Sequence, residues 1–423
     1  MQGLIKKVTF EGFDGALNIF ERYDSVVWAF FFMQTLQSIA WSIISPFLSI
    51  YLKTSFGISA SMIGALYMIT GIVGVFSAPV CGGLCDRLNR KSILVFGGIV
   101  SVIGNVILAV MAMVNTNFYT FSFVFIARSI FGGWSMIAMS AMLADIISSQ
   151  KRLEVYGLMG AGSNTGFAIG SLLGGFLTAS SSLIFFLSAV FMIPPLLISL
   201  FFIKGTAPKP ETLATSNSGF LQFLRNIIAV MRNRVAISFL GILTLLGLVW
   251  GQFYGLFPIY AEKFVGISSS EMGVAYALEG AIMAVFSYSI SRWATKFNLV
   301  TVYGIGAGLF SLSVLGVGVM PSLTGILLFY SVIEAFAEMF CTPTSNAIMA
   351  ALAPEGQRGM YMGVLSLFQR TQSSYAPLIG GILMDHLAPQ FLLFWLFFTA
   401  IGLIATALCL PLKKMAKSTF KSD

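Results

Sequence analysis

Five ionisable residues lie inside long apolar stretches of a chain in which only 9% of the residues are charged. Ionisable groups inside membrane-crossing helices are costly, so each is a candidate for function. They are Arg128, Glu279, Glu334, Glu338 and Arg370. Glu334 and Glu338 are one helical turn apart and share a helix face, and neighbouring carboxylates in a low dielectric resist double ionisation. One of the two can therefore hold a proton near neutral pH, which is the chemistry of proton coupling.

Two interpretations are open for the charges around this pair. Arg370 lies midway along its apolar stretch, where it would neutralise one of the carboxylates during a proton relay. Alternatively, Arg370 and Glu338 form a structural pair that only locks two helices together. Glu279 stands alone in its own stretch, where it would serve a proton or a cationic substrate.

Length and composition indicate that these residues belong to helices that cross a lipid bilayer. The chain has 423 residues, of which 57% are hydrophobic, whereas a soluble protein holds about 25% charged residues. A helix needs about 20 apolar residues to cross a bilayer, and it satisfies its own backbone groups. The sequence offers twelve such helices, near 26–51, 60–82, 92–113, 118–147, 155–178, 182–203, 236–260, 270–291, 299–320, 323–351, 359–384 and 390–411.

Lysine and arginine indicate how these helices are oriented. With an even number of spans both termini lie on one side, and all but four of the 24 Lys and Arg residues fall there. Lys53 and Lys263 lie on the opposite side, and Arg128 and Arg370 lie within spans. The positive-inside rule predicts that both termini are cytoplasmic in a multi-pass protein of the cell (plasma) membrane. This asymmetry accounts for most of the net charge of +8, so we expect no nucleic-acid partner.

The chain repeats itself after half its length. Gly57–Gly64 corresponds to Gly266–Gly273, and Gly170–Gly175 corresponds to Ala376–Gly381. Six spans have been duplicated, which aligns Arg128 with Glu334 and predicts a site between the halves near the bilayer midplane. We expect an all-α membrane protein with twelve transmembrane helices in two six-helix pseudo-symmetric bundles. The expected parts are a cytoplasmic N-terminal segment at 1–24, bundles at 25–203 and 236–411, a cytoplasmic linker at 204–235 and a cytoplasmic tail at 412–423.

The charged stretch Gly82–Lys91 follows the second span, and we expect it to form a tight turn at the water's edge. The residues that match the cytoplasmic loop motif G-x-L-a-D-R-x-G-R-K are Gly82, Leu84, Asp86, Arg87, Arg90 and Lys91. The chain therefore resembles the Major Facilitator Superfamily. Asn89 stands where that family usually has Gly, and the resemblance implies a left-handed backbone there, which Asn tolerates better than most residues. The second-half counterpart of this stretch, Ser291–Asn298, has lost the acid and both glycines.

The resemblance implies that this loop takes part in gating. Asp86 would meet the cytoplasmic start of the eleventh span in the outward-open state, because a carboxylate is favoured at a helix N-terminus. Arg87 and Arg90 would bind neighbouring acids such as Asp145 or Glu154. The alternative is that the basic residues of the loop only fix the topology.

Two further patterns resemble the same superfamily. Arg128–Gly132 looks like its R-x-x-x-G motif in the fourth span. The fifth span follows G-x8-G-x3-G-P-x2-G-G, with Ser171 in place of the proline, at Gly157, Gly166, Gly170, Gly174 and Gly175. This pattern is associated with drug–proton antiporters. Its spacing also puts small residues on one helix face, so close helix packing is the alternative explanation, and glycine-rich fifth spans occur in symporters.

Polar residues within the spans are candidates for a substrate cavity, because amides that face lipid are costly. The first span places several of them on one helical face by i, i+3 and i+4 spacing. The members of that face are Gln34, Gln37, Ser38, Trp41 and Ser45. Further candidates are Asn164, Gln252, Tyr254, Gln369 and Gln372.

Other residue types argue against catalysis. The chain has a single histidine, His386, and lacks both an ATP-binding loop and a G-x-S-x-G motif. Its four cysteines fall in spans or at cytoplasmic ends, where a structural disulfide is not expected. We therefore expect no catalytic residue, metal site or cofactor. The expected partners are a small-molecule substrate, protons and the lipid bilayer, and we expect a monomer.

Together these patterns predict a secondary active transporter that works by alternating access, with proton-coupled export of drugs or metabolites. The alternative within transport is a proton symporter or facilitator for sugars, organic acids or other metabolites. A channel is a further alternative. From another class, a polytopic membrane enzyme would require a clustered nucleophile, base or metal site at the interface.

Overall fold

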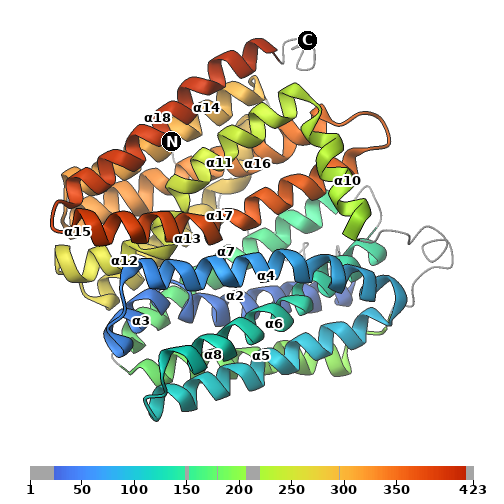
Figure 1. Ribbon diagram of the computed structural model, residues 1–423. Helices are drawn as coiled ribbons and strands as arrows, with labels where there is room; N and C mark the ends of the chain where they lie inside the picture. Colours follow the sequence, from blue (N-terminus) through green and yellow to red (C-terminus); the bar gives the residue numbers. More distant parts are fainter. Residues whose placement is uncertain (1–22, 148–151, 179, 206–219, 295, 416–423) are drawn as a thin grey trace, which may run out of the picture.

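The computed structural model describes residues 23–147, 152–178, 180–205, 220–294 and 296–415, and within these ranges the chain is helical without strands (Figure 1). Most of the expected N-terminal segment 1–24 and of the tail 412–423 lies outside these ranges. The first half consists of α2 (Ser25–Ile44), α3 (Leu48–Phe56), α4 (Ala60–Arg87), α5 (Arg90–Met113), α6 (Phe118–Ile146), α7 (Arg152–Leu177) and α8 (Ser181–Phe201).

The second half repeats this order after the connecting helix α10 (Phe220–Met231), which lies in the segment expected as the linker. Its helices are α11 (Arg234–Gly255), α12 (Phe257–Tyr260), η1 (Ala261–Val265), α13 (Ser269–Ala294), α14 (Leu299–Val319), α15 (Leu323–Gly325), η2 (Ile326–Glu334), α16 (Ala335–Leu352), α17 (Arg358–Leu387) and α18 (Phe391–Met415). The elements η1 and η2 are π-helical, and such segments are frequent at functional sites.

The packing of the two halves is equivalent. In the first half α2 packs on α7 and α8, and α5 packs on α6 and α8. In the second half α11 packs on α17 and α18, and α14 packs on α16 and α18. The seams between the halves also form a matched pair, α4 on α17 and α13 on α7. These contacts confirm two pseudo-symmetric bundles, in which α6 and α16 occupy equivalent places.

Ten helical segments among the described residues are long and apolar enough to cross a membrane by themselves. The other two expected spans are α7 and α17, which are 26 and 30 residues long but carry more polar residues. Both lie in the seams between the halves, α7 against α13 and α17 against α4.

The turn between α4 and α5 is shorter than the sequence predicts. Helix α4 continues to Arg87 and α5 begins at Arg90, so only Leu88 and Asn89 lie outside helices. Asn89 has an extended backbone (φ −62°, ψ 117°), and its side chain accepts a hydrogen bond from the Lys91 amide at 3.0 Å. The expected left-handed Asn89 was therefore wrong, because this residue caps the start of α5 and does not reverse the chain itself.

The two ends of the molecule differ in how closely the halves approach. We call the end with α10 and the Leu88–Asn89 turn the α10 end, and the opposite end the far end (right and left in Figure 1). At the far end, the Asp385 carboxylate of α17 accepts hydrogen bonds from the backbone amides of Ala60 and Ser61, at 3.0 and 2.9 Å. A Cβ atom on Gly175 would lie only 2.8 Å from Gly273 Cα across the other seam. The halves therefore touch at the far end.

Candidate functional site

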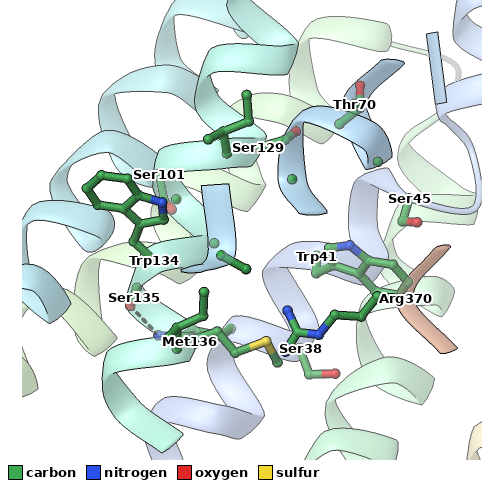
Figure 2. Close-up of a pocket in the computed structure, with 18 of the residues that line it drawn as sticks. Ser38, Trp41, Ser45, Thr70, Ser101, Ser129, Trp134, Ser135, Met136 and Arg370 are labelled. Carbon is green, nitrogen blue, oxygen red and sulfur yellow. Dashed lines mark hydrogen bonds between the residues drawn. The ribbon is translucent and has the colours of Figure 1, made fainter. Parts of the chain in front are cut away.

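A cavity of about 1090 Å³ lies between the halves, and both halves line it (Figure 2). It extends toward the α10 end, where Gly82, Gly83 and Asn226 line it. Trp41 from α2 and Arg370 from α17 reach it from opposite halves. Since the halves touch at the far end, the cavity is accessible from the α10 end.

The polar face predicted for the first span lines this cavity. Its members Gln34, Gln37, Ser38, Trp41 and Ser45 all contribute to the lining. Gln34 Nε2 donates to Ser163 Oγ at 2.9 Å, and Ser38 Oγ donates to the Ser163 carbonyl at 2.6 Å. The Trp41 side chain is 47% exposed. These contacts hold α2 against α7 and leave the Trp41 indole accessible from the cavity.

Close packing of α7 on α2 requires the glycines of the fifth span. A Cβ atom on Gly166, Gly170 or Gly174 would collide with the backbone of α2. Gly175 faces α13 instead, and a Cβ atom on Gly157 would meet nothing within 4 Å. The predicted small-residue face is therefore present, but Gly157 does not belong to it.

Three carboxylates meet beside the cavity. Glu279 on α13, Glu334 at the end of η2 and Glu338 on α16 each place one oxygen within 4.8 Å of the others, and we call them the carboxylate cluster. Glu279 and Glu338 line the cavity, whereas Glu334 does not. Glu279 and Glu334 are fully buried and Glu338 is half-buried. The sequence indicated that Glu279 stands alone. In the structure it joins the other two glutamates, because α13 packs on η2 and α16.

Aromatic donors hold two of these carboxylates. Tyr254 OH donates to Glu279 Oε1 at 2.8 Å, and Tyr330 OH donates to Glu279 Oε2. Trp250 Nε1 donates to Glu338 Oε2 at 3.2 Å. Among the described residues no hydroxyl or N–H group donates to Glu334, whose oxygens meet the other two carboxylates. The sequence indicated Tyr254 but not Trp250 or Tyr330, although Trp250 precedes Tyr254 by one helical turn.

The two arginines of the spans also line the cavity. Arg128 lies on α6, where its aliphatic part packs over Gly104, and its Nε atom has no partner among the described residues. Arg370 lies on α17 of the other half. The cavity thus carries basic groups from both halves and acidic groups from the second half only.

The remaining substrate candidates lie in different places. Asn164 and Tyr254 line the cavity. Gln252 does not, because it is fully buried and donates to the Ala376 carbonyl of α17 at 2.8 Å. Gln369 and Gln372 line a separate cavity of about 240 Å³ within the second half.

The loop residues lie at the α10 end. Arg90 forms an ion pair with Asp145 of α6 and donates to the Ala141 carbonyl at 3.3 Å. Lys91 Nζ donates to the Leu200 carbonyl of α8 at 2.7 Å. Arg87 is exposed, and Asp86 belongs to the last turn of α4. The loop is thus joined to its own half by two basic side chains.

A sequence profile of the Major Facilitator Superfamily matches residues 30–288 and 253–422. The Na(+), Li(+), K(+)/H(+) antiporter of Planococcus maritimus is 26% identical over 377 residues, which cover 82% of this chain and 86% of that protein. Quinolone resistance protein NorA of Staphylococcus aureus (strain MSSA476) is 25% identical, with 81% and 86% covered. Multidrug resistance protein 1 of Bacillus subtilis (strain 168) is 23% identical, with 78% and 82% covered.

Solved structures show the same fold. A point mutant of the peptide transporter POT in complex with sulfate matches with a TM-score of 0.74 at 16% identity, covering 94% of this chain and 95% of that one. A bacterial homologue of the human lysosomal transporter Spinster, in an inward-facing and unoccupied conformation, matches with a TM-score of 0.74 at 14% identity, covering 94% and 98%.

Proposed function

The chain belongs to the Major Facilitator Superfamily, and on that premise we propose that it is a proton-coupled secondary transporter that exports drugs or metabolites by alternating access. It is a multi-pass membrane protein with the fold of solved transporters. The observation that carries the proposal is the carboxylate cluster at the edge of the central cavity. Proton-driven transport requires a titratable group that cargo and protons can both influence, and Glu279 and Glu338 occupy that position.

The names of the relatives support exchange against protons. One is described as a cation/H(+) antiporter, and two others as resistance proteins for quinolones and for multiple drugs. We therefore assign proton coupling to the carboxylate cluster with Arg128 and Arg370. Substrate contacts are assigned to residues that line the cavity, namely Gln34, Gln37, Trp41, Asn164 and Tyr254. Substrate binding by Gln252 and Gln369 stays a prediction, although neither residue lines the central cavity.

Orientation follows from the charge distribution. With both termini cytoplasmic, the α10 end faces the cytoplasm and the cavity is open on that side. Gating then involves Asp86, Arg87, Arg90 and Asp145 at the cytoplasmic end. We propose domain boundaries at 25–203 and 236–411, on either side of the linker.

Proteoliposomes with an imposed pH gradient test the proposal. Ethidium is a suitable probe because its permanent charge prevents it from redistributing as a weak base. We expect uphill ethidium movement toward the acidic compartment for the wild type, and its loss in the variants Glu279→Gln, Glu334→Gln and Glu338→Gln. Glu355→Gln makes the same chemical change at an exposed position and should keep activity. Proton-driven movement in all three cluster variants would contradict the relay.

Symport or facilitated uptake is the second candidate, since solved neighbours of the same fold include a peptide transporter. The direction of flux separates the two functions. In vesicles of known orientation, export predicts that cargo and protons move in opposite directions, whereas symport predicts movement in the same direction.

A further inference from the structure

Trp250 and Tyr254 lie one turn apart on α11, and their rings line the central cavity. We propose that these two residues are positioning residues that transmit the presence of cargo to the carboxylate cluster. The inference rests on the proposed proton-coupled transport and names the side chains that perform the coupling. Each ring has a face toward the cavity and a polar atom bound to a carboxylate.

The polar atoms connect α11 to two other helices. Trp250 Nε1 donates to Glu338 on α16 at 3.2 Å, and Tyr254 OH donates to Glu279 on α13 at 2.8 Å. A hydrogen bond donated to a carboxylate stabilises its ionised form, and the effect is larger in a low dielectric. Moving either ring therefore changes how readily its carboxylate exchanges a proton. Because both rings are half-buried, cargo can reach them without opening the protein core.

The rings also form part of a row that crosses between the halves. Tyr254 and Trp250 have ring centroids 4.7 Å apart, and Tyr254 lies 6.0 Å from Phe167 of α7 in the first half. Phe167 in turn lies 6.3 Å from Trp41 of α2. Aromatic rings at these separations attract one another, so the row is a continuous apolar wall for cargo.

Its position makes the row sensitive to the transport cycle. Alternating access moves one half against the other around a fixed site. The Phe167–Tyr254 contact joins the halves and must change in that motion, while the bonds to Glu279 and Glu338 stay within the second half. Cargo that lies on the wall and the movement of the halves thus act on the same two hydrogen bonds.

The test compares two rates in proteoliposomes with ethidium as the probe. Counterflow without a pH gradient measures binding and the motion of the halves, and accumulation driven by a pH gradient adds proton coupling. For Tyr254→Phe and Trp250→Phe we expect the ratio of accumulation to counterflow to fall at least tenfold. Tyr276→Phe is the matched control, because that buried hydroxyl donates to the Phe253 carbonyl and to no carboxylate.

The outcomes are distinct. A ratio within twofold of the wild type in both variants would overturn the inference, as would an equal loss of both rates, which indicates packing only. If Tyr254→Phe does not fold, as judged by thermal melting, Trp250→Phe decides the result through the other carboxylate. If the wild type itself shows counterflow but no proton-driven accumulation, the proposed function fails, and the inference fails with it. If the wild type couples normally but the ratio of accumulation to counterflow is unchanged in the variants, only the inference fails and the proposed function stands.

Discussion

The two halves share one helical arrangement but place different chemistry around the cavity. In the first half, amides and hydroxyls bind each other, as Gln34 does with Ser163 and Gln37 does with Ser135. In the second half, three glutamates meet, and indole and phenol groups donate to two of them. Duplication therefore supplied the scaffold, and divergence placed the acidic groups on one side only.

The largest effect is expected for Glu334→Leu. This removes a fully buried carboxylate to which no hydroxyl or N–H group among the described residues donates, and such a group costs about 1–3 kcal/mol. We expect proton-driven ethidium accumulation to fall about 100-fold, within the range for loss of an acid–base group. The melting temperature of the purified protein should rise at the same time.

This prediction tests whether the second half keeps its acid at the expense of stability. The control is Ser140→Ala on α6 of the first half, which removes an exposed polar group and should leave both measurements unchanged. A lower melting temperature for Glu334→Leu would mean that the carboxylate is needed for folding.

A smaller effect is expected for Gly170→Val in the first half. The added atoms would collide with the backbone of Ile39 on α2, and overpacking of this kind costs about 1–3 kcal/mol. Gly157→Val on the same helix is the matched control, because nothing lies within 4 Å of its Cβ position. Thermal melting of both variants checks the prediction, and equal melting temperatures would contradict the role of this face.

At the far end, Asp385→Ala should loosen the seam between the halves. The change removes the acceptor for the Ala60 and Ser61 amides, and loss of a helix cap costs about 1 kcal/mol. We expect about a fivefold shift toward states open at this end, measured as a longer distance between spin labels on the exposed residues Ser55 and Gln390. Asp385→Asn keeps an acceptor oxygen and should shift less; an identical shift in both would refute the capping role.

The smallest effect is expected for Asp86→Asn. A carboxylate at a helix N-terminus contributes about 0.3–1 kcal/mol, so weakening the closed cytoplasmic end should slow transport about two- to fivefold. Ethidium efflux from proteoliposomes measures the rate, with circular dichroism to show that the protein remains folded. Ser291→Ala at the start of the equivalent second-half segment is the comparison and should change little, since that segment has lost the acid. Unchanged efflux in Asp86→Asn would contradict the gating role of Asp86.

Local sequence signals predicted the helices well and the turn residues poorly. The expected spans fall on the observed helices because a run of apolar residues of bilayer length has few other stable structures. Asn89 was misassigned because asparagine suits both a left-handed turn and a helix cap, and only the backbone conformation distinguishes them. Asn298 begins α14 with the same kind of cap, so the duplicated feature is the cap.

The site was predicted in part for a related reason. The face of α2 follows from helical periodicity, and its members line the cavity as expected. The same periodicity cannot tell which of several faces of α11 meets the cavity, so Gln252 was grouped with Tyr254 although it faces α17. Asp385 was not indicated at all, because its partners lie 325 residues away in the sequence.

The sequence by itself determined that this protein is a duplicated twelve-span member of the Major Facilitator Superfamily, because hydropathy, repeat and loop motif are all patterns in the order of residues along the chain. Only the tertiary structure decided that Glu279 joins Glu334 and Glu338, and that Trp250 and Tyr254 hold two of these carboxylates. These contacts arise between helices far apart in the sequence, and their geometry depends on how α11, α13 and α16 pack. The sequence alone shows which ionisable residues lie in the spans, whereas their hydrogen-bond partners are known only from the folded structure.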